Sequence, residues 1–219
     1  SINKMRKNTF DNTKGNQDDI PNYKVKNYIY FNGKNSILNL KLNQSSKNIN
    51  TDFPTLEFGF SFIFWIYVKN ELLENYSRNF PSNVITLVNI GIVGHKIQLI
   101  LKKLNLLQIV IDDKEIGKCE LTKTKFIYND WNFMAFYLTE KNRGKSPSIK
   151  LLINDNKELL SIELPNNLPF NEIITSISLF ENFLGRITSA LFFSFCLDIK
   201  VIDFNRRSEE RFSRNAETD

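Results

Sequence analysis

The segment Phe58–Val68, with the sequence FGFSFIFWIYV, is the longest apolar run in the chain. Its aromatic and β-branched side chains favour the pleated backbone of a strand over a helix. Successive side chains of a strand point to opposite faces, and both faces of this segment are apolar, so we expect an inner strand with a packed layer on each side. Burial of one aromatic ring contributes roughly 2–3 kcal/mol, so this segment can anchor a core.

A second aromatic segment, Asp130–Leu138 (DWNFMAFYL), is also apolar on both parities and is predicted to be a second central strand. The aromatic side chains of these two segments and of the last predicted strand are expected to form the structural core. These residues are Phe60, Phe62, Phe64, Trp65, Trp131, Phe133 and Phe193.

The remaining pattern is a succession of short strands separated by turn residues. Tyr28–Phe31 and Ser36–Leu42 flank Asn32-Gly33, which predicts a hairpin. Four strands between residues 84 and 121 are spaced like a meander, and a further hairpin spans 149–164. The last strands, 176–180 and 186–197, complete an all-β chain whose doubly apolar strands favour a sandwich of two antiparallel sheets packed face to face.

A chain of 219 residues is compatible with one sandwich domain. We assign residues 1–26 to a polar N-terminal arm or tail and residues 27–202 to the β-sandwich. Residues 203–219 are expected to be a charged C-terminal tail or a short helix.

The order of the first strand, Phe58–Val68 and Asp130–Leu138 resembles the concanavalin A-like, laminin G-like jelly roll, and the match covers roughly Tyr28 to Ile202. Within that superfamily, Gly59-Phe-Ser-Phe62 ahead of Trp65, followed by Trp131, is most similar to the concanavalin-like domain of BEACH (neurobeachin and beige-like) proteins. Asp155 stands where that family often has glycine and departs from its pattern.

The resemblance implies a non-catalytic protein-interaction module, part of a large BEACH-type scaffolding protein of vesicle trafficking. Its partner would be a protein or an adjacent domain of the same chain, in the cytoplasm and at membrane surfaces. The alternative that stays open is a glycan-binding, lectin-like domain of a secreted or surface protein. The chain shows no signal peptide, which favours the cytosol, and its longest apolar run is too short for a transmembrane segment.

Several chemistries are disfavoured by the residues themselves. The Glu-x-Asp-x-Glu strand of glucanases is absent, and the nearest pair, Asp113 and Glu115, adjoins a predicted turn, so we expect no enzyme. His95 is the only histidine, is expected in a surface turn, and excludes a His-rich zinc site. The net charge of +5 is scattered along the chain, so no nucleic-acid partner is expected.

Three minor alternatives remain: a calcium site, a sugar-binding surface and a disulfide bridge. Four aspartates could offer oxygen ligands to calcium but form no contiguous signature, so no cofactor is expected. They are Asp112, Asp113, Asp130 and Asp155. Three tyrosines could stack on a sugar ring, although core positions are the favoured interpretation. They are Tyr76, Tyr128 and Tyr137. Cys119 and Cys196 are expected to be reduced thiols, with a single bridge as the alternative.

Overall fold

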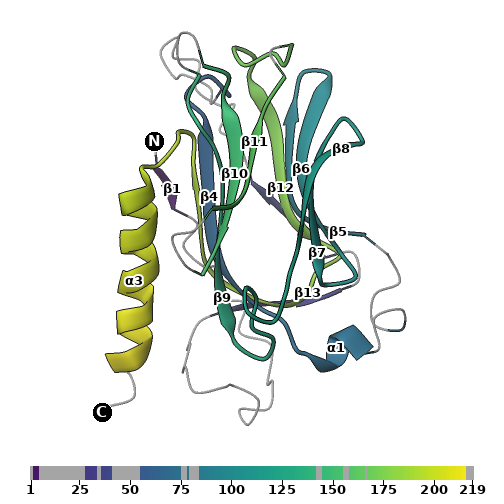
Figure 1. The fold of residues 1–219 in the computed structure, drawn as a ribbon, viewed down its shortest axis with the longest axis vertical. Helices are drawn as coiled ribbons and strands as arrows, with labels where there is room; N and C mark the ends of the chain where they lie inside the picture. The colour runs from purple at the N-terminus through teal and green to yellow at the C-terminus, as the bar shows by residue number, and fades with distance from the viewer. Residues whose placement is uncertain are drawn as a thin grey trace.

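The computed structural model describes residues 2–4, 28–33, 36–40, 55–74, 78, 84–141, 145–154, 158–165 and 167–215. These residues form an all-β sandwich of two antiparallel sheets, as predicted, with a long helix beside one of them (Figure 1). None of the helices in this part of the chain is long and apolar enough to cross a membrane.

The larger sheet, sheet A, has the order β1-β13-β4-β9-β10-β11, and β2 pairs with β13 beside β1. Its strands are β1 (Ile2–Lys4), β2 (Ile29–Asn32), β4 (Phe60–Tyr67), β9 (Trp131–Leu138), β10 (Ser148–Ile153), β11 (Glu158–Glu163) and β13 (Leu184–Phe193). The two aromatic segments are neighbours at its centre, with Phe60 opposite Leu138 and Tyr67 opposite Trp131.

Sheet B has the order β3-β12-β5-β6-β7-β8. Its strands are β3 (Leu38–Leu40), β5 (Val84–Ile92), β6 (His95–Lys102), β7 (Leu106–Ile111), β8 (Lys114–Glu120) and β12 (Ile174–Glu181). Strands β5 to β8 pair consecutively, which confirms the predicted meander. The predicted hairpin of β10 and β11 is confirmed as well.

The predicted hairpin of the first two strands is wrong, because β2 belongs to sheet A and β3 to sheet B. The connection from β2 to β3 passes from sheet A to sheet B. It lies beside the connection from β12 to β13, which passes from sheet B to sheet A. The amide of Gly33 donates to the carbonyl oxygen of Phe183 (2.9 Å), and the amide of Asn182 donates to that of Ser36 (3.0 Å). Since β12 and β13 diverge here, β3 follows one and β2 the other.

The main core lies between the sheets and is rich in phenylalanine. Phe60, Phe62 and Phe64 point into it from β4, and each is fully buried. Phe136 of β9 and Phe180 of β12 meet them from both sheets. The alternate residues of β4 therefore face away from this core. Predicted strand residue Phe58 lies before β4 and is exposed.

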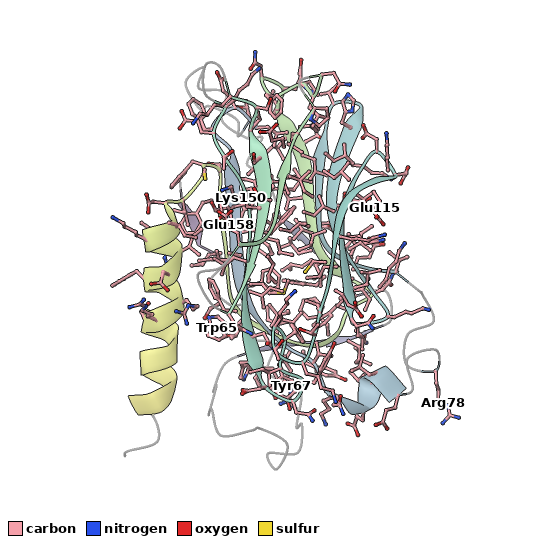
Figure 2. All side chains as sticks on the ribbon, in the orientation of Figure 1. Trp65, Tyr67, Arg78, Glu115, Lys150 and Glu158 are labelled. Atoms are coloured by element: carbon pink, nitrogen blue, oxygen red, sulfur yellow. The ribbon has the colours of Figure 1, made fainter. Side chains whose placement is uncertain are left out.

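A second apolar cluster covers the outer face of sheet A, and we call it the outer cluster. It contains Ile63, Phe133, Ala135, Tyr137, Leu152, Phe193, Leu197 and Ile202, with Trp65, Leu191 and Cys196 packed against it. Ile202 comes from α3 (Ile199–Asn215), so this helix supplies the second layer expected over the doubly apolar strands. In Figure 2, Trp65 lies between sheet A and α3.

Helix α3 begins before the charged segment to which a tail or short helix was assigned. Asp198 caps its first turn, where its carboxylate accepts the amide hydrogen of Lys200 (2.7 Å). Asp203 then pairs with Arg206 (2.9 Å) and Arg207 (2.8 Å) along the helix. The capping residue and the burial of Ile202 explain why the helix starts at Ile199 and stays against the sheet.

Trp65 was expected in a fully covered core, but its side chain is only half-buried, with an edge-to-face contact to Phe133 at 5.5 Å. Its buried indole N–H has no hydrogen-bond partner among the described residues. We therefore expect Trp65→Ala to lower the free energy of unfolding by about 2 kcal/mol, less than truncation of a buried ring, and Trp65→Phe by less than about 1 kcal/mol. Urea titration of both variants checks this, and a larger loss for Trp65→Phe would show that the N–H is paired.

The two sheets meet along one edge of the sandwich, where β8 and β11 lie opposite each other. Gly117 of β8 has no side chain, and a Cβ atom at this position would overlap the Cδ1 atom of Ile162 on β11. Leu160 of β11 is the next side chain in that direction. Glycine at position 117 thus lets the strand edges approach closely.

Candidate binding site

The outer face of sheet A carries a cluster of tyrosine, tryptophan and arginine at the end of β4, and we call it the Arg186 cluster. It consists of Tyr28, Tyr67, Trp131 and Arg186, with Tyr30 beside it. Strand register builds it, because Arg186 of β13 lies directly opposite both Tyr67 of β4 and Tyr30 of β2. Figure 2 shows Tyr67 at the lower end of the sandwich, below Trp65.

The aromatic rings surround the arginine. The Cζ atom of Arg186 lies over the ring of Tyr28 at 5.0 Å from its centroid and over that of Tyr67 at 5.1 Å. Trp131 packs against both tyrosines, with ring centroids 6.4 Å from Tyr28 and 5.6 Å from Tyr67. A guanidinium over tyrosine rings gains cation–π attraction, which strengthens as the site is desolvated.

Exposure rises across the cluster from its floor to its rim. Tyr67, Trp131 and Arg186 are buried, Tyr28 is half-buried, and Tyr30 is 46% exposed. A ligand could therefore meet the ring of Tyr30 first and the guanidinium last.

The charge of Arg186 is unpaired within the part of the chain that the structure describes. The residue is only 8% exposed, and none of the ion pairs formed by these residues includes it. Its guanidinium nitrogens are not among the fully buried polar atoms of these residues that lack a hydrogen-bond partner, so the head group keeps contact with solvent. Buried charges are normally paired, because loss of water from an ion is costly. The aromatic rings attract the cation but do not replace the acceptors of its N–H groups.

Two of the candidate acidic residues, Asp112 and Asp113, lie together beside the start of β6. The carboxylate of Asp112 accepts from Nδ1 of His95 (2.6 Å) and from the amide of Lys96 (2.9 Å), and Asp113 pairs with the ammonium of Lys96 (2.7 Å). The hydrogen bond from His95 is the main cause that lowers the pKa of Asp112. His95 is the first residue of β6, directly after the turn in which it was expected.

The remaining carboxylates do not converge with this pair. Glu115 on β8 contacts Gln108 and Lys118, as Figure 2 shows on the far side of the molecule from Lys150 and Glu158. Asp130 accepts the amide hydrogen of Trp131 (2.7 Å), and burial raises its pKa. Asp155 lies outside the described residues. Within the described ranges, no three His, Cys, Asp or Glu side chains gather to hold a metal ion.

Two of the three tyrosines considered for sugar stacking are described by the structure, and the hydroxyl group of each forms a hydrogen bond within the domain. The hydroxyl of Tyr128 donates to the carbonyl oxygen of Leu104 (2.7 Å), and burial raises its pKa to about 12. Tyr137 is buried in the outer cluster and donates to Glu158 (3.2 Å), which Lys150 also contacts (2.7 Å). Tyr76 lies outside the described residues.

Both cysteines are free thiols. Cys119 is buried on β8, and Cys196 is half-buried beside the outer cluster. Burial raises the pKa of the Cys196 thiol, which disfavours the reactive thiolate.

Sequence reasoning missed the Arg186 cluster, although one signal pointed to it. Arg186 is the only charged residue in the strand LGRITSALFF. Charged side chains are rarely buried without a partner, so a single charge in an apolar strand indicates an ion-pair partner or a ligand. The tyrosines gave no such signal, because their convergence depends on the pairing of β13 with both β2 and β4.

No protein-family model matches the chain, and no curated protein is similar to it in sequence. The fold is similar to solved botulinum neurotoxin domains. The serotype D binding domain has a TM-score of 0.50 at 17% identity, covering 79% of this chain and 40% of that chain. The serotype D ligand binding domain in complex with N-acetylneuraminic acid has a TM-score of 0.51 at 16% identity, covering 78% of this chain and 39% of that chain.

The chain thus spans about 40% of the length of the solved chains that it matches. At these identities the likeness concerns the fold, and it agrees with the expected jelly-roll sandwich. The finer resemblance to BEACH proteins receives no support from these matches. The chain therefore shares a β-sandwich fold with neurotoxin receptor-binding domains.

Proposed function

We propose that this domain is a non-catalytic binding module whose ligand is a glycan held at the Arg186 cluster. The observation that carries the proposal is Arg186 itself, a largely buried cation that lies over two tyrosine rings and forms no ion pair with the described residues. Binding sites combine apolar and aromatic walls with a few placed polar groups, and this cluster has both. One of the solved domains of similar fold holds an acidic sugar, N-acetylneuraminic acid, which supports a glycan as the ligand class.

The non-catalytic part of the proposal is supported by the state of the candidate carboxylates. Asp113 pairs with Lys96, and Glu115 contacts Lys118 and Gln108, so each acid of the nearest candidate pair is engaged separately. A glycosidase needs two carboxyl groups that face one scissile bond. The solved domains of similar fold are described as binding domains.

A protein-interaction module of a BEACH-type scaffold in vesicle trafficking is the second candidate. It is favoured by the apolar side chains that α3 leaves exposed: Ile199, Val201 and Phe204, the last 70% exposed. The two candidate functions imply different locations for the protein. A glycan ligand fits a secreted or surface protein, and a scaffold partner fits the cytoplasm.

The proposal is tested on a glycan array with the 219-residue chain, its Arg186→Met variant and, as a matched control, Arg207→Met on the exposed side of α3. We expect the wild type and Arg207→Met to be retained by the same glycans, and Arg186→Met to lose them. Absence of glycan binding by the wild type would reject the proposal. Thermal unfolding of each variant shows that the binding loss is not a loss of fold.

A further inference from the structure

We infer that the ligand of the Arg186 cluster is a sugar that carries a carboxylate, and that Arg186 receives that carboxylate. The inference rests on the proposed function and adds the chemical class of the ligand. It starts from the charge on Arg186, which forms no ion pair with the described residues, because a neutral sugar that covered the guanidinium would remove water from it without supplying a counter-ion.

The guanidinium suits a carboxylate better than other acceptors. Its planar N–H groups match the two oxygens of a carboxylate in a bidentate pair, and such charge-assisted hydrogen bonds are about twice as strong as neutral ones. Tyr28 and Tyr67 contact the guanidinium with their ring faces, at 5.0 and 5.1 Å from Cζ, and so keep the side chain in place without using its donors. The arginine is thus pre-organised for an anion that arrives from the rim.

The rim favours a sugar over an acidic peptide as the carrier of the carboxylate. Tyr30 is directly opposite Arg186 on the neighbouring strand and 46% exposed, and Tyr28 beside it is half-buried. The exposed ring of Tyr30 and the ring of Tyr28 against the guanidinium offer flat apolar surface for a ring-shaped ligand, with a single ionic contact at Arg186. An acidic peptide would instead be matched by a row of cations, and Arg186 is the only cation among the described residues of this cluster.

The test uses isothermal titration of the 219-residue chain with four probes: a sialylated trisaccharide, its carboxyl methyl ester, a uronic-acid disaccharide and the neutral parent disaccharide. The first and third probes distinguish the two sources of a sugar carboxylate. The ester keeps the hydroxyl groups of the sialylated probe but lacks its charge. The neutral disaccharide is that of the uronic-acid probe with CH₂OH in place of each carboxylate, and it also keeps the other hydroxyl groups. We expect at least one acid to bind, and its uncharged counterpart to bind at least about tenfold more weakly, as loss of a charged hydrogen-bond pair requires.

Three variants test which residue binds the carboxylate of the sugar. Arg186→Lys keeps the charge without the planar fork and is expected to weaken binding of the acid about tenfold. Arg186→Met should remove the preference for acid over ester. Tyr30→Ala, at the exposed rim, should weaken both probes alike. Arg207→Met on α3 is the control and should change neither.

The failure of this inference differs from that of the proposed function. If the acid and its ester bind the wild type equally, the glycan assignment stands and the carboxylate assignment is overturned. If no sugar binds, both are overturned. If a poly-glutamate peptide binds more tightly than every sugar and Arg186→Met abolishes that binding, the ligand is an acidic protein, which also overturns both.

Discussion

Phe62→Ala is expected to lower the free energy of unfolding by about 3–5 kcal/mol, the cost of deleting a buried ring and leaving a cavity. The Phe62 side chain is fully buried, and its ring centroid lies 4.9 Å from that of Phe64 and 6.0 Å from that of Phe180. These neighbours belong to both sheets, so the cavity would open between them. Equilibrium unfolding in urea measures the loss.

Phe204→Ala is the matched control, since Phe204 on α3 is 70% exposed. Its truncation should change the free energy of unfolding by no more than about 0.5 kcal/mol. Equal losses for the two variants would contradict the assignment of the main core to the space between the sheets.

Gly59→Ala is expected to lower the free energy of unfolding by about 2–4 kcal/mol, because two effects add. Gly59 has a φ of 71°, a left-handed conformation that costs alanine about 1 kcal/mol. In addition, the new Cβ atom would overlap the carbonyl oxygen of Leu138, which is backbone of β9 and cannot rotate away. Relief requires β4 and β9 to separate, and overpacking of this kind costs about 1–3 kcal/mol.

Gly94 separates the two effects. It has the same φ of 71°, but a Cβ atom there would meet no atom of the structure within 4 Å. Gly94→Ala should therefore cost only the backbone strain, about 1 kcal/mol. Thermal unfolding followed by circular dichroism compares the two variants, and equal destabilisation would mean that the contact with Leu138 is not tight.

The strands that were predicted correctly are those whose partners follow directly in the chain. The meander of β5 to β8 and the hairpin of β10 and β11 need only short turns and alternating side chains, which the residues display. The error at β2 and β3 has the opposite cause. Asn32-Gly33 is a good turn in a hairpin and equally good where the chain moves to another sheet, and the choice depends on β12 and β13, about 140 residues away.

The apolar patterning also explains why the fold was easier to predict than the ligand. The phenylalanines of the motif, Phe60 and Phe62, are core residues, and they report how the sheets pack rather than what the surface binds. The outer face at Trp65 is covered by α3, which was expected only as a charged tail or a short helix from residue 203 and in fact begins at Ile199, after the capping residue Asp198. The surroundings of Arg186 could not be predicted from the sequence, because they depend on the register of β13 with β2 and β4, which are distant in the chain.

The close approach of β8 and β11 has a consequence for the behaviour of the chain at high concentration. An open strand edge is a template on which a second molecule can add its own strand and begin an aggregate. At β8 the contact of Gly117 with Ile162 leaves little room for an incoming strand, and the strand carries alternating lysines and glutamates, in the sequence KEIGKCE. At the opposite side, the edge strands β1, β2 and β3 have only three or four residues each, too short to support extended pairing. In the part of the chain that the structure describes, these edges therefore disfavour the addition of a second molecule's strand.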